Sequence, residues 1–206
     1  MRKLILLSTF IFFYSSKASS FALPNDSLDI MIGQMIMIGI GDFNMVDPKL
    51  PIFEEIKQGT IGGVVLYEKN LLFESPKPEL ALLVDHLQKN AEIPLFISID
   101  EEGGFVSRMK TRYGFPKNVS AQYLGELDDL DSTRYYAKQT AALLSSFGIN
   151  MNYAPVVDVN LNARNPVIGR IERSYSSQYR TVIRHAYEVV ATHKDTQVIP
   201  VLKHFP

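Results

Sequence analysis

The sequence contains no cysteine. This absence excludes disulfide bonds, thiolate metal sites and a cysteine nucleophile. It also excludes a lipid anchor on an N-terminal cysteine. It does not fix the compartment, because an exported domain can fold without disulfides.

An excess of charge of one sign is absent as well. The 206 residues carry a formal net charge of −1, and the basic residues are scattered rather than gathered in runs. A nucleic-acid surface requires clustered positive charge. The composition therefore argues against a nucleic-acid partner.

Long apolar runs are also scarce, and the clearest one lies at the N-terminus. A basic start is followed by the apolar stretch 4–14 and then by small residues, with cleavage possible after Ala18 or Ala22. This three-part pattern is typical of a secretory signal peptide, and the stretch is shorter than the about 20 residues that a membrane span needs. We expect residues 1–22 to be a signal peptide, with an uncleaved anchor as the alternative. Residues 23–206 are then an exported domain, periplasmic or secreted, with no stable membrane insertion after signal removal.

Apolar runs alternate with helical patterns along the rest of the chain. Strands that are apolar along their whole length are covered on both faces, which indicates a parallel sheet in an α/β fold. A doubly wound sheet and a (β/α)8 barrel both fit, although no G-x-G-x-x-G follows a strand. Ser132 is the expected N-cap of the fourth helix, which should end at Gly148. Strands are expected at residues 61–67, 94–99, 150–159 and 198–202, and helices at residues 28–40 (ending as a short strand), 51–58, 78–90, 132–147 and 178–194.

Polar side chains follow three of these strands, where ligands bind in parallel α/β folds. Asp100, Glu101 and Glu102 follow the second strand and precede two glycines, with Arg108 close by. A carboxylate of this loop could accept hydrogen bonds from a polar ligand. The alternative is a solvated acidic turn with a local salt bridge.

The next two strand ends carry further hydrogen-bonding groups. The long connection 160–177 holds several arginines, and a loop of this length inside a compact domain is often functional. Lys203 and His204 follow the last strand. Such a set suits a hydroxyl-rich ligand such as a sugar, but it would also suit an anion, because Arg and Lys bind carboxylate and phosphate well.

At these same positions the chain resembles glycoside hydrolase family 3, and within it the β-N-acetylhexosaminidase branch. The matching segments occur in the family's order and extend from about Leu28 to the last residue. K-H-F-P and E-G-G favour this branch over the β-glucosidase branch. The segments are IGGVVLY (61–67), D-x-E-G-G-x-V-x-R (100–108), NYAPVVDV (152–159), NPVIG (165–169), RSY (173–175) and KHFP (203–206).

The resemblance implies a (β/α)8 barrel of which this chain holds only about the first half, since a whole barrel needs about 250 residues. It also implies that four side chains hydrogen-bond the hydroxyls of the innermost sugar, and that no metal or organic cofactor takes part. These substrate-binding residues are Asp100, Arg173, Lys203 and His204.

Two departures from the family pattern concern the predicted site. Phe105 stands where the branch often has Arg, and extra residues before Arg173 leave Arg170 as an alternative for the sugar contact. We prefer Arg173 because Ser174 and Tyr175 continue the match.

The family's nucleophile, an Asp, and its proton donor, a His, are expected beyond Pro206, because the chain stops inside the K-H-F-P-G-H-G motif. Asp158 is a tempting nucleophile but matches a segment that we expect to be structural.

The sequence thus predicts the N-terminal part of an exo-acting glycosidase that removes terminal N-acetylglucosamine from cell-wall or chitin-derived sugars. The alternatives are a β-glucosidase or β-xylosidase of the same family and a non-catalytic, sugar-binding remnant. We expect the 206-residue chain by itself to be inactive and marginally stable, because a half barrel exposes sheet edges and apolar faces.

Overall fold

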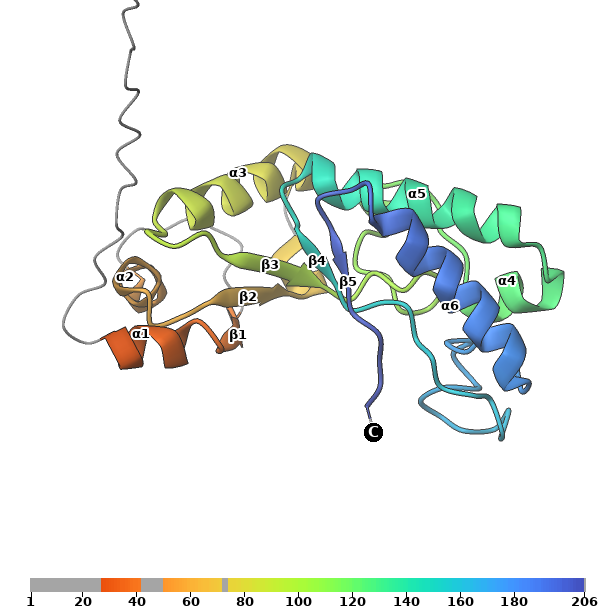
Figure 1. The fold of residues 1–206 in the computed structure, drawn as a ribbon. Helices are drawn as coiled ribbons and strands as arrows, with labels where there is room; N and C mark the ends of the chain where they lie inside the picture. Colours follow the sequence, from red (N-terminus) through yellow and green to blue (C-terminus); the bar gives the residue numbers. More distant parts are fainter. Residues whose placement is uncertain (1–26, 42–49, 72–73, 206) are drawn as a thin grey trace, which may run out of the picture.

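The computed structural model describes residues 27–41, 50–71 and 74–205 (Figure 1). The predicted signal peptide and Pro206 lie outside this part of the chain. Within it, no helix is long and apolar enough to cross a membrane. The strands are β1 (Met37–Gly39), β2 (Gly63–Leu66), β3 (Phe96–Ile99), β4 (Met151–Asn152) and β5 (Ile199–Pro200); the helices are α1 (Ser27–Gly33), α2 (Pro51–Gln58), α3 (Pro76–Lys89), α4 (Ala121–Leu127), α5 (Leu130–Ser146) and α6 (Tyr179–His193), with short 3₁₀ turns at Glu68–Leu71 and Thr111–Tyr113.

The five strands form one parallel sheet in the order β1-β2-β3-β4-β5. Crossovers between parallel strands are right-handed, so an order that never reverses puts successive crossover helices on the same face of the sheet. Figure 1 shows α3 and α5 along one side of the strands in this way. A doubly wound sheet would reverse its strand order at a switch point. The α/β class with a parallel sheet is confirmed, and the strand order is consistent with the first half of a (β/α)8 barrel.

The core lies between the central strands and the helices that cover them. Alternate residues of β2 and β3 point toward α3 and are fully buried. Each large aliphatic side chain buried in this way contributes about 1.5–3 kcal/mol. The core contacts include Val64, Leu66, Ile97 and Ile99 of the strands and Leu80, Leu83, Val84 and Leu87 of α3.

Most predicted elements occur where the sequence placed them, but helix α4 was not predicted and two further details of the prediction were wrong. The N-cap of α5 is Asp129, whose carboxylate accepts hydrogen bonds from the backbone N–H groups of Asp131 and Ser132, so Ser132 is inside the helix. The strand expected at residues 150–159 is paired only at Met151–Asn152 and again at an isolated bridge of Val156 with Lys203. Pro155 lies between the two pairings and has no N–H to donate to a ladder.

Helix α6 presents an apolar face that the described part of the chain leaves open. Ile183 is 60% exposed and Tyr187 is 65% exposed. Together with Leu202 beyond β5 they line an apolar groove of about 350 Å³. Exposed apolar patches favour association with other apolar surfaces.

We predict that the purified chain self-associates through this face. Ile183→Lys with Tyr187→Lys should lower the association measured by sedimentation velocity over a range of protein concentrations, because each ammonium would have to be buried at the contact. Tyr135→Lys on α5, where Tyr135 is equally exposed, is the matched control and should leave association unchanged. A wild-type chain that remains monomeric with a sharp thermal transition would contradict this prediction and the expected marginal stability.

Candidate functional site

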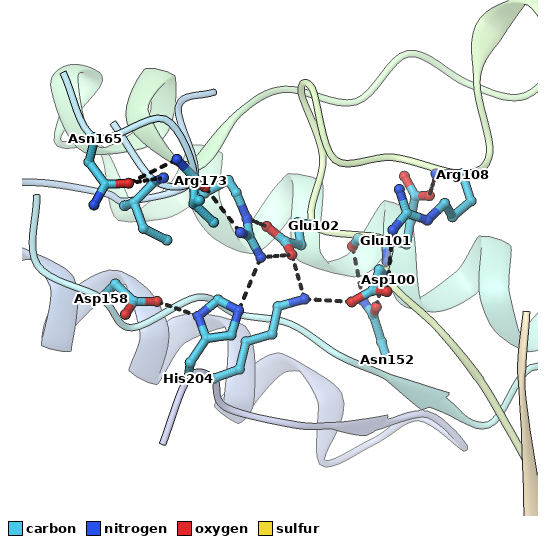
Figure 2. A network of polar contacts seen from close by, with 12 residues as sticks. Asp100, Glu101, Glu102, Arg108, Asn152, Asp158, Asn165, Arg173 and His204 are labelled. Carbon is cyan, nitrogen blue, oxygen red and sulfur yellow. Dashed lines mark hydrogen bonds and ion pairs between the residues drawn. The ribbon is translucent and has the colours of Figure 1, made fainter. Parts of the chain in front are cut away.

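The carboxyl ends of β3 and β5 meet through a lysine shared by two carboxylates. Asp100 follows β3, and its Oδ1 lies 2.6 Å from Nζ of Lys203, which follows β5. The same ammonium also pairs with Glu102 (Figure 2). All three side chains are largely buried, so the ion pairs are weakly screened by solvent. The structure therefore brings together two predicted site residues that are far apart in the sequence.

Glu102 also receives the guanidinium of Arg173 in a two-pronged pair. Nε of Arg173 lies 2.7 Å from Oε2 of Glu102, and Nη2 lies 2.8 Å from Oε1. The side chains are only 11% and 5% exposed. The hydrogen bonds that Arg173 donates to Glu102 raise the pKa of Arg173 above its ordinary value, so the guanidinium stays charged. Arg173 also donates to the carbonyl of Val167 in its own loop at 3.1 Å. Its pair with Glu102 holds the loop after β4 against the loop after β3.

His204 links this pair to Asp158. Its Nε2 lies 3.2 Å from Nη2 of Arg173, and its Nδ1 lies 2.6 Å from Oδ2 of Asp158 (Figure 2). Arginine can only donate, so Nε2 must accept and the ring proton belongs on Nδ1, where it is donated to the carboxylate. We call these six residues, Asp100, Glu102, Asp158, Arg173, Lys203 and His204, the rim network.

Glu101 points away from the rim network and is part of the interior. Its carboxylate accepts hydrogen bonds from Ser107 Oγ at 2.6 Å and from the backbone N–H groups of Arg108 and Met109 at 2.8 and 3.0 Å. Burial nevertheless raises the pKa of Glu101 above its ordinary value. The side chain of Asn152 on β4 bonds both the N–H and the C=O of Glu101. These contacts fix the backbone from which Asp100 and Glu102 project.

The structure brings most of the residues predicted from the sequence together and leaves one of them on the surface. Asp100, Arg173, Lys203 and His204 come together, and Arg108 lies beside Asp100 at 3.3 Å as expected. Arg170 is exposed on the surface. Glu102, which joins Arg173 to Lys203, was not singled out from the sequence, although it belongs to the same acidic loop.

The end of β2 carries a second ionic cluster on the same rim. Glu68 accepts hydrogen bonds from Lys110 Nζ at 2.6 Å and from the Tyr113 hydroxyl at 2.9 Å, and it also pairs with Arg112. The hydrogen bond from Lys110, followed by those from Tyr113 and Arg112, lowers the pKa of Glu68 to about 2 despite partial burial. This cluster ties the loop after β3 to the end of β2.

Among the described residues, no group of three or more His, Asp and Glu side chains is arranged to hold a metal ion.

We predict that Arg173→Met lowers the free energy of unfolding by about 3 kcal/mol, because it leaves the buried Glu102 carboxylate with one cation fewer. Methionine keeps most of the apolar stem, so packing changes little. Arg184→Met is the matched control, since Arg184 pairs with Asp128 where both side chains are half-exposed. Urea unfolding should show a much smaller loss for the control, because exposed pairs contribute little. Equal losses for the two variants would contradict the assignment of Glu102 and Arg173 as a buried pair.

We also predict a pH dependence from Glu68. Its pKa is lower in the folded chain than in the unfolded chain, so its ion pairs stabilise the fold fully above pH of about 4.5, and this stabilisation is lost as the pH falls toward about 2. Glu68→Gln should flatten the fall in stability across this range when thermal unfolding is followed at a series of pH values. Glu92→Gln, which changes an exposed carboxylate, should keep the wild-type profile. Parallel profiles for wild type and Glu68→Gln would show that this cluster contributes nothing.

Comparison with known proteins places this geometry in a family. The model of the glycosyl hydrolase family 3 N-terminal domain matches residues 27–206. Beta-hexosaminidase A of Pseudoalteromonas piscicida is 33% identical over 196 residues, which is 85% of this chain and 32% of that protein. Beta-hexosaminidase LpqI of Mycobacterium tuberculosis is 38% identical over 114 residues, which is 55% of this chain and 29% of that protein.

A solved structure gives the same result at the level of the fold. The glycoside hydrolase family 3 β-N-acetylglucosaminidase of Paenibacillus sp. FPU-7 superimposes with a TM-score of 0.76 at 34% identity, covering 87% of this chain and 33% of that one. The chain thus spans about a third of the length of these relatives. Because the family model extends over nearly the whole described chain, the protein belongs to glycosyl hydrolase family 3 and comprises residues of that family's N-terminal domain.

Proposed function

We propose that this chain supplies the sugar-binding rim of an exo-acting β-N-acetylhexosaminidase, which removes terminal N-acetylglucosamine from cell-wall or chitin-derived sugars. The names of the relatives support this choice: two are beta-hexosaminidases and one is a β-N-acetylglucosaminidase. They favour it over the β-glucosidase and β-xylosidase alternatives.

The observation that carries the proposal is the charge balance of the rim network taken together with Arg108, which pairs with Asp100. The charged side chains at the site occur in equal numbers of each sign, and each cation lies against a carboxylate. Each of the three described cations at the site thus already pairs with a carboxylate, so the anionic ligand that the sequence left open is disfavoured. What remains is a set of hydrogen-bond donors and acceptors that suits neutral hydroxyl groups. The negative groups are Asp100, Glu102 and Asp158, and the positive groups are Arg108, Arg173 and Lys203.

In this proposal four residues orient the innermost sugar. The Asp100 carboxylate accepts hydrogen bonds from hydroxyls, Arg173 and Lys203 donate to the hydroxyls beside it, and Nε2 of His204 accepts. Charge-assisted hydrogen bonds are stronger than neutral ones and are directional, so they fix the ring relative to the reacting bond. Their mutual pairing holds the side chains in place before the sugar arrives.

We assign neither the nucleophile nor the proton donor to this chain. A retaining glycosidase needs two carboxyl-type groups, or equivalents, on either side of the scissile bond. Asp158 is the acid of this chain that comes closest to the role of nucleophile. However, its carboxylate accepts a hydrogen bond from His204, and its backbone carbonyl accepts one from Ser174 Oγ at 2.6 Å. This supports a positioning role for Asp158.

We further propose that the protein is exported. The support comes from the basic start, the apolar stretch 4–14 and the small residues up to position 22 of the sequence. Export would place the enzyme where cell-wall fragments and chitin-derived sugars occur.

The proposal predicts that N-acetylglucosamine binds to the chain and that Asp100→Asn weakens the binding at least about tenfold, because the hydrogen bonds to a charged group are replaced by neutral ones. Isothermal titration calorimetry measures both. Asp195→Asn changes an exposed acid outside the rim network and should bind like wild type.

Glucose serves as the discriminating ligand in the same experiment. Binding of glucose as tight as that of N-acetylglucosamine would support the β-glucosidase alternative instead. If Asp100→Asn leaves the affinity unchanged, the sugar does not bind at the rim network and the proposed site is wrong.

A further inference from the structure

A small cavity lies between the rim network and the facing sides of α5 and α6. Glu102 and Arg173 line it on the rim side, and Thr140 of α5 and His193 of α6 line it on the helix side. The cavity leaves about 40 Å³ of room for water-sized spheres. Pockets for small organic ligands measure about 300–1,000 Å³, so this one is too small for a sugar or an organic cofactor. A water molecule needs only roughly 10–15 Å³ of such room, so at least one water fits.

The imidazole of His193 is buried in the lining of this cavity with one nitrogen unpaired. The residue is only 4% exposed, and its Nδ1 lies 2.8 Å from the carbonyl of Val189, one helical turn earlier. A carbonyl can only accept a hydrogen bond, so Nδ1 carries the ring proton and Nε2 carries a lone pair. In the described part of the chain, no protein group lies within hydrogen-bond distance of the buried Nε2.

The charge state of His193 does not remove the need for a partner. Burial lowers the pKa of the His193 imidazole below its ordinary value, so the ring is neutral at neutral pH and Nε2 remains an acceptor. A buried acceptor without a donor destabilises the fold, because it has lost its hydrogen bonds to solvent. Nε2 therefore requires a donor from a molecule that this cavity can hold.

Water is the molecule that the lining suits, because a buried water needs two to four polar partners. The Thr140 hydroxyl oxygen accepts from Nδ2 of Asn118 at 3.0 Å, so its own proton points elsewhere and can be donated. The carboxylate of Glu102 can accept a further hydrogen bond. A metal ion is disfavoured, since among the residues that the structure describes no three His, Asp or Glu side chains are arranged to hold one.

We propose that this cavity binds an ordered water molecule that donates a hydrogen bond to Nε2 of His193. The bound water completes the hydrogen bonding of the last turn of α6 and occupies the space behind the pair of Glu102 and Arg173. This inference does not rest on the proposed function, because it uses only the cavity and the unpaired nitrogen. It would hold equally for a chain that binds another sugar or none.

The test compares high-resolution crystal structures of the whole chain and of two variants. Wild type should show density about 2.7–3.2 Å from Nε2 of His193, the distance of a hydrogen bond. Val189→Ile adds a methylene to a residue that lines the cavity and should displace the water. Val182→Ile is the matched control, since Val182 is another buried valine of α6 that does not line the described cavity, and this variant should keep the density.

A solution measurement supports the same comparison. Oxygen-17 relaxation dispersion of the solvent detects waters that stay bound for longer than the protein takes to tumble. The signal of wild type and of Val182→Ile should exceed that of Val189→Ile by about one buried water.

Three outcomes would overturn the inference. The cavity is dry if wild type shows no density beside Nε2 and no excess over Val189→Ile in the dispersion. A peak only about 2.0–2.1 Å from Nε2 marks a metal ion rather than a water. Density and dispersion that persist unchanged in Val189→Ile would show that the water lies outside this cavity. If Val189→Ile does not fold, the density beside Nε2 in wild type decides alone, and no outcome bears on the proposed sugar specificity.

Discussion

The ammonium of Lys203, held between the carboxylates of Asp100 and Glu102, is the contact on which the rim depends. It joins the ends of β3 and β5, which are separated by 103 positions between Asp100 and Lys203. Charges with so little exposure are stable only when paired, so each of the three groups requires the others in place. The end of β5 is held by this ionic contact together with its two-residue ladder and the bridge of Lys203 with Val156.

The long loop after β4 is ordered by the same principle. Arg173 enters the rim because Glu102 offers both carboxylate oxygens to it. Immediately after it, Tyr175 is buried and stacks on His185 of α6 at 5.1 Å between ring centroids. His185 is in turn held by Thr133 of α5 at 2.7 Å. The helix layer thus supports the position of Arg173, because the segment that follows Arg173 packs against α5 and α6.

The loop after β3 has successive residues that face different surroundings. Asp100 and Glu102 face the rim, while Glu101 turns inward and accepts three hydrogen bonds that replace water. The glycine turn that follows carries Phe105 outward again. One short segment therefore supplies two carboxylates to the rim network and an internal anchor for its own backbone.

The sequence by itself determined the parallel α/β class and the approximate positions of the strands and helices, because strands covered on both faces must be apolar. It also indicated the strand ends at which Asp100 and Lys203 stand, because ligands bind where parallel strands end. Only the tertiary structure decided that Glu102 is the partner of Arg173 and that Glu101 is internal. The sequence already favoured Arg173 over Arg170, and the structure places Arg173 in the rim network. These outcomes depend on pairings between residues far apart in the chain, and neither helical nor strand periodicity carries information about which charges will meet. Glu101 and Glu102 are adjacent and chemically identical, and they differ in role only because the fold buries Glu101 in the interior and turns Glu102 toward the rim network.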